Sequence, residues 1–159
     1  MTADELWVES YQGEVLGETL FGVMAEREKD PVHRRQLEVL TLLERATKEL
    51  AEPVFTRRQV DRGDSASSVA SGIQLADAVA GMTWTEFLSS FESITAEFLA
   101  KYHQLVELAD DENDRRVAET YVAHEVALAR FARRGLGQEA GDPLEDILAL
   151  PHVAAVLAG

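Results

Sequence analysis

Acidic residues and one histidine recur in this sequence on helical faces that are otherwise apolar. On a helical wheel, Glu14 and Glu18 fall at the centre of a stripe that also holds Tyr11 and Phe21. An unpaired carboxylate that leaves water costs several kcal/mol, so inward glutamates need an arginine or lysine, shared protons or a metal ion. Further candidates lie at the centre or the edge of the stripes of three later helices: Glu44, Glu92, His124 and Glu125.

A metal ion is an attractive source of the missing positive charge. Carboxylate oxygens and imidazole nitrogens are ligands of iron and manganese, and the interiors of helix bundles are where such centres are built. Two plainer interpretations stay open. Glu44 and Glu92 at the edge of a stripe are also placed to reach solvent, and His124 on an apolar face also suits a hydrogen-bonded core histidine.

Helical periodicity and capping signals predict the elements that must position these residues. The first helix is marked by steps of four and three between Trp7, Tyr11, Glu14, Glu18, Phe21 and Ala25. Asp30-Pro31, an N-cap aspartate followed by proline, starts the second helix, and Thr83 with Glu86 has the spacing of a capping box. Asp142-Pro143 repeats the first signal. The expected helices cover residues 3–29, 31–55, 84–109, 112–135 and, shorter, 143–150, with a crossover over 56–83.

These elements predict an all-α fold, a four-helix bundle in a single domain over residues 1–159. Short turns make the first two and the last two long helices antiparallel hairpins, and the long crossover joins the hairpins. A second apolar strip on the first helix, formed by Leu16, Leu20 and Val23, is expected to receive the C-terminal helix or another subunit, so a homodimer is plausible.

The arrangement resembles the ferritin-like superfamily, and its rubrerythrin-type members in particular. The resemblance covers residues 5–135 as architecture. The residues that carry it are Gly13-Glu14, Phe21 and Ala25 in the first helix, Glu44 in the second, Glu92 in the third and Ala123-His124-Glu125 in the fourth. The resemblance implies a bundle with two metal ions that serve oxygen or peroxide chemistry or iron oxidation.

The sequence departs from the family at both Glu-x-x-His motifs. The motif histidine is expected three residues after each glutamate. Thr47 stands at that position after Glu44, and Leu128 stands there after Glu125. His124 could supply a nitrogen ligand from a neighbouring position, and Glu18 an extra carboxylate. The expectation is an altered or single-metal iron or manganese site with oxidase or oxygenase chemistry. The alternative is a metal-free bundle that acts as an interaction or small-ligand-binding module, with its inner glutamates matched by arginines such as Arg45 or Arg130.

The composition bears on which classes of partner the protein can bind and on the compartment in which it is expected. The formal net charge is −14, which disfavours nucleic acid and anionic membrane surfaces. The paired arginines, such as Arg133-Arg134, are interpreted as solvated helix faces and ends. There is no cysteine, no signal-peptide pattern at the N-terminus and no apolar stretch long enough to cross a bilayer, so a cytoplasmic protein is expected.

Overall fold

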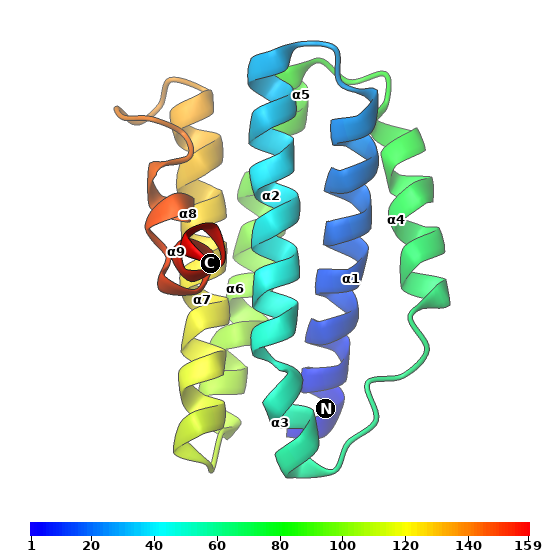
Figure 1. Cartoon of the computed structure of the whole chain (residues 1–159), viewed down its shortest axis with the longest axis vertical. Helices are drawn as coiled ribbons and strands as arrows, with labels where there is room; N and C mark the ends of the chain where they lie inside the picture. Colours follow the sequence, from blue (N-terminus) through cyan, green and yellow to red (C-terminus); the bar gives the residue numbers. More distant parts are fainter. The chain divides into compact units, whose positions relative to one another are not determined.

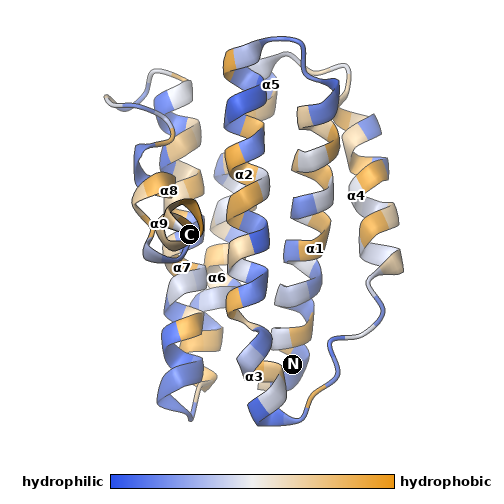
Figure 2. Cartoon of the chain, in the orientation of Figure 1, coloured by the Kyte–Doolittle hydropathy of each residue, from blue (hydrophilic) through white to orange (hydrophobic).

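The computed structural model describes residues 1–159, which form helices and connections without any strand. The all-α class expected from the sequence is therefore confirmed. Two compact units divide the chain, Met1–Gly81 and Met82–Gly159, and each has its own set of helices. Figure 1 labels these helices, and Figure 2 shows that most of them carry both apolar and polar residues.

The first unit begins with α1 (Ala3–Arg27) and α2 (Pro31–Leu50), which pack against each other as a hairpin. Thr2 and Glu5 form a capping box at the start of α1. The Asp30 carboxylate accepts hydrogen bonds from the backbone N–H groups of Val32 and His33, so the cap expected from the sequence starts α2.

The helix predicted over 31–55 is divided in two by the structure. α2 ends at Leu50 and α3 (Glu52–Arg58) follows, with only Ala51 between them. Pro53 explains the break, because proline has no backbone N–H to donate to the preceding turn and its ring crowds that turn. Gln59, with a φ of 55°, then ends α3 in the left-handed region.

The crossover contains α4 (Ala66–Val79), which packs along α1 on the side away from α2 (Figure 1). The contact is close at Gly72, where an added Cβ would lie 2.8 Å from the Leu16 carbonyl oxygen and 2.8 Å from Thr19 Cβ. The face of α1 that was expected to receive the C-terminal helix or another subunit thus receives α4 at Leu16. The sequence did not indicate that α4 would pack on this face of α1, because the buried residues of α4, Gly72 and Ala76, are small rather than large and apolar.

The second unit contains α5 (Trp84–Ser89), α6 (Phe91–Leu108) and α7 (Glu112–Gly135). The single helix predicted over 84–109 is interrupted at Ser90, whose hydroxyl donates to the Phe87 carbonyl oxygen at 2.6 Å, a local bond that competes with helix continuation. The Asp111 carboxylate caps α7, and α6 and α7 form the second hairpin.

The chain ends in α8 (Glu145–Ala149) and α9 (Pro151–Ala158), which follow α7 in the same unit. The sequence predicted one short helix over 143–150 and missed α9. Pro151 is the first residue of α9, where a proline needs no hydrogen-bond partner, so it starts a helix here instead of ending one.

The largest buried side chains of each unit are apolar or aromatic. None of the helices combines the length and the apolar character that crossing a membrane requires. The first unit buries Leu6, Trp7, Leu37, Leu40 and Leu43 among others, and the second Leu88, Tyr102, Leu105, Tyr121, Phe131 and Ile147.

Candidate metal centre

Glu14 is a buried carboxylate on the middle of α1. Its residue is 1% exposed, and Tyr11 and Val15 beside it are buried too. The helical wheel therefore placed Glu14 correctly, because the stripe from Trp7 to Ala25 runs along one continuous helix without a break. A carboxylate at this depth requires a cation, a proton or several hydrogen-bond donors around it.

Glu44 reaches α1 from the neighbouring α2. It is 7% exposed, and its carboxyl group lies against Gly17. A Cβ added to Gly17 would fall 2.7 Å from the Glu44 Cδ and 2.9 Å from each carboxylate oxygen, closer than any real Cβ contact allows. The space that the Glu44 carboxylate occupies exists because residue 17 has no side chain.

The two carboxylates come together inside the first unit. An oxygen of Glu14 and an oxygen of Glu44 lie within 4.8 Å of each other. Like charges at this separation repel strongly away from bulk water, so ionised forms need positive charge nearby. A divalent cation bound by one oxygen from each residue meets this need with the hard oxygen ligands that iron and manganese accept.

The carboxylate of Glu18, one turn after Glu14, is neutralised by two basic side chains of α2. Its carboxylate makes ion pairs with Arg45 Nε at 2.8 Å and Lys48 Nζ at 2.5 Å, both from α2, and its side chain is 20% exposed. Burial acts to raise the pKa of Glu18, but hydrogen bonds from Lys48 and Arg45 outweigh it and hold the pKa below the usual range. The structure thus gives Glu18 two protein cations as partners.

The second unit buries the fourth-helix candidates on α7. His124 is 0% exposed and Glu125 4% exposed. The His124 Nε2 lies 3.9 Å from the Glu125 Oε1, an ion-pair distance if the imidazole is protonated. Both residues are therefore inside the fold as expected, and each offers a ligand atom of the right type.

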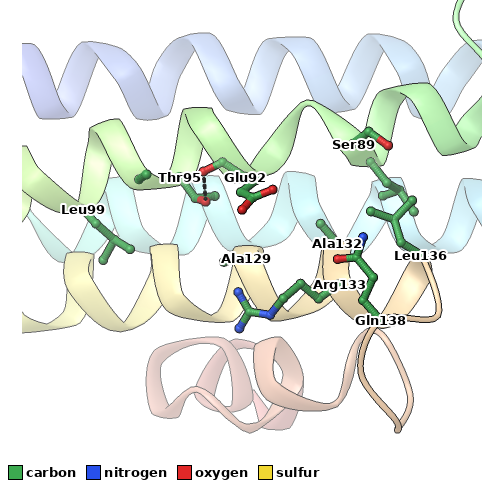
Figure 3. A pocket seen from close by; sticks show the side chains of 11 residues that line it. Ser89, Glu92, Thr95, Leu99, Ala129, Ala132, Arg133, Leu136 and Gln138 are labelled. Carbon is green, nitrogen blue, oxygen red and sulfur yellow. Dashed lines mark hydrogen bonds between the residues drawn. The ribbon is translucent and has the colours of Figure 1, made fainter.

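Glu92 differs from the other candidates because its side chain is exposed. It follows the buried Phe91 by one residue at the edge of the α6 stripe and lines an open groove with Thr95 and Arg133 (Figure 3). The plainer interpretation of an edge glutamate, access to solvent, holds for this residue.

The two positions where the family has motif histidines are filled by residues without a nitrogen ligand. Thr47 is 0% exposed and Leu128 is 5% exposed. Leu128 has no ligand atom at all, while the Thr47 hydroxyl offers an oxygen. The chemistry of these donors does not fit the family's complete two-metal set. The Glu14 and Glu44 pair fits a single, oxygen-rich site.

Two buried polar side chains, those of Arg134 and Asp114, were not predicted from the sequence. The Arg134 side chain is 6% exposed and lies 3.2 Å from Asp146, so it is not a solvated helix end but a buried link between α7 and α8. Asp114, near the start of α7, is 1% exposed. Its position three residues after the cap residue Asp111 was the only available signal, and that position is usually exposed.

His152 on α9 is a partly buried histidine. Burial, with a smaller contribution from the charge of His124, lowers its pKa to about 4. The neutral imidazole is therefore the form present at pH 7.

No family model, curated protein or solved structure matches this chain.

Proposed function

We propose that this chain is a ferritin-like protein that binds one iron or manganese ion at Glu14 and Glu44. The observation that carries the proposal is the approach of these two buried carboxylates, with oxygens within 4.8 Å, at a place where Gly17 makes room for one of them. The two helical hairpins, one in each unit, support the fold part of the proposal.

The roles of the protein residues follow from their positions. Glu14 and Glu44 supply negatively charged oxygen ligands from two adjacent helices, and the absent side chain at Gly17 fixes where the Glu44 carboxylate lies. Glu18 is paired with Arg45 and Lys48, which keeps its charge balanced without a metal ion. A bound iron or manganese ion with open coordination positions supplies oxidase or oxygenase chemistry toward dioxygen or peroxide.

Metal content after expression in iron- or manganese-supplemented cells tests the proposal. Wild-type protein is expected to hold about one ion per chain, and Glu14→Gln and Glu44→Gln are each expected to lose it, because the neutral amide is a poor ligand. Glu26→Gln on α1 and Glu38→Gln on α2 remove exposed carboxylates from the same helices and should keep the metal.

Two further variants test the candidate ligands of α7. His124→Gln and Glu125→Gln are to be measured in the same way, and loss of metal in either one extends the ligand set to that residue. Substoichiometric metal in the wild type that is unchanged in the Glu14 and Glu44 variants rejects the proposal.

A metal-free interaction or small-ligand-binding protein is the second candidate. Three observations favour it: the ion pairs of Glu18 with Arg45 and Lys48, the aliphatic Leu128 at a motif histidine position and the exposed Glu92. Arg130, the other arginine considered as a partner for the inner glutamates, instead pairs with Glu139 and Asp146. This candidate predicts wild-type protein without stoichiometric metal after supplementation.

A further inference from the structure

A groove of about 450 Å³ runs between α6 and α7 within the second unit (Figure 3). Its volume falls in the range of small-molecule sites, about 300–1,000 Å³. The groove is open because alanines, Ala96 on α6 and Ala129 and Ala132 on α7, line it where larger side chains would fill the space between two helices. The fold itself therefore leaves room for a ligand of modest size.

Glu92 is the acidic group at the middle of this groove. Figure 3 shows its carboxylate directed from α6 toward the side of α7 that holds Ala129 and Ala132. The carboxylate has no hydrogen-bond or ion-pair partner in the protein, and the side chain is exposed. It is thus available to a cation that enters the groove.

The other charged lining residue, Arg133, has an acidic partner in the protein, Glu139, which it shares with Arg130 and Arg134. Its Nε lies 3.3 Å from Glu139 Oε2, and Glu139 also accepts a charge-assisted hydrogen bond from Arg130 at 2.6 Å. The net charge of −14 adds a field that attracts cations to the whole molecule. The charge that the groove offers without a partner is therefore negative.

Apolar side chains occupy the groove on either side of Glu92. Leu99 lies toward one end in Figure 3 and Leu136 toward the other, and Leu88 is a further lining residue. A ligand that makes use of both features needs an ammonium group for Glu92 and a hydrocarbon part for the leucines and alanines. We propose that this groove binds small organic amines with an aliphatic body.

Three probes of equal chain length separate the charge from the hydrocarbon contribution: hexylamine, hexanol and hexanoate. Binding is followed by the NMR shifts of the Ala129 and Ala132 methyl groups in the intact chain at low ionic strength. Hexylamine is expected to bind saturably and more tightly than hexanol, and hexanoate should bind least, because Glu92 repels it.

Variants at the groove locate the effect. Glu92→Gln should weaken hexylamine binding about three- to fivefold, the size of one exposed ion pair, and leave hexanol unchanged. Glu97→Gln, an exposed glutamate on the same helix that does not line the groove, should bind hexylamine like the wild type. Ala96→Leu fills the groove from an exposed position that tolerates a larger side chain, and it should weaken both probes.

Two results would overturn the proposal. Shifts that grow linearly with hexylamine concentration indicate non-specific association. Hexanoate binding equal to or tighter than hexylamine binding assigns the groove to anions through Arg133 instead. Neither result depends on metal at Glu14 and Glu44, so the groove and the metal proposal fail or succeed separately.

Discussion

Gly17 and Glu44 form one arrangement at the scale of single residues. The carboxylate of Glu44 lies where the side chain of any other residue at position 17 would start. A glycine in the middle of a helix costs about 1 kcal/mol relative to alanine. In return, the glycine lets the Glu44 carboxylate approach α1 closely enough to lie near Glu14.

Gly17→Ala is expected to displace the Glu44 carboxylate and to weaken metal binding at least tenfold, as changes to groups that orient a ligand commonly do. Gly22→Ala is the matched control, because an added Cβ there meets only Thr41 Cγ2, at 3.6 Å, an ordinary contact. Manganese titration of both variants measures the affinities, and thermal unfolding of the metal-free proteins measures stability.

The metal-free proteins keep this test independent of the metal proposal. Gly22→Ala should be stabilised by up to about 1 kcal/mol through helix propensity, whereas in Gly17→Ala overpacking should outweigh that gain. Equal stabilisation of the two variants, with equal manganese affinity, would show that the Glu44 carboxylate moves aside freely and that Gly17 has no positioning role.

Residue types and spacing predicted some of the candidate site but not its pairings. The burial of Glu14 follows from its place at the centre of an unbroken stripe. The contact between Glu44 and Gly17 depends on how α2 is shifted along α1, which a helical wheel does not contain. Glu92 shows the limit of an edge position, because rotation of the helix by a fraction of a turn decides between core and solvent.

At the scale of elements, helix starts were predicted better than helix interruptions. Asp30 and Thr83 cap helices at the positions where they were expected, since a capping side chain acts on backbone groups two or three residues away. The breaks at Ala51 and Ser90 and the extra helix α9 were missed. Each depends on one proline or serine whose effect changes with its position in the turn.

The docking of α9 is expected to depend on pH through His152. Its pKa of about 4 lies below the ordinary 6.5, owing to burial and to the charge of His124. As the pH falls through 6.5, His152 becomes protonated in the unfolded chain. In the folded chain it becomes protonated only near pH 4. Stability from this histidine is therefore complete above pH 6.5 and decreases toward pH 4.

Urea unfolding of wild type and His152→Gln at pH 7 and pH 4.5 measures this effect. The wild type should lose roughly 1–2 kcal/mol more than the variant between these pH values, allowing for partial exposure of the imidazole. His103→Gln, at an exposed position on α6, is the control and should follow the wild type. Identical losses in wild type and His152→Gln would mean that His152 does not resist protonation in the folded state.

At the scale of the whole molecule, strong negative charge and buried carboxylates act in the same direction. The net charge of −14 concentrates cations near the surface, and Glu14 and Glu44 offer two buried oxygen ligands to one that enters. The sequence predicted the all-helical class and both hairpins from short turns and apolar stripes. It did not reveal that Lys48 joins Arg45 in neutralising Glu18, because that pairing forms only when α1 and α2 align.

Anomalous diffraction at the manganese or iron edge, from crystals of metal-loaded protein, shows directly whether Glu14 and Glu44 bind one ion together. We expect one peak per chain, about 2.0–2.2 Å from an oxygen of Glu14 and from an oxygen of Glu44. Well-ordered Glu14 and Glu44 side chains with no peak beside them, or with the metal bound only at surface carboxylates, would contradict it.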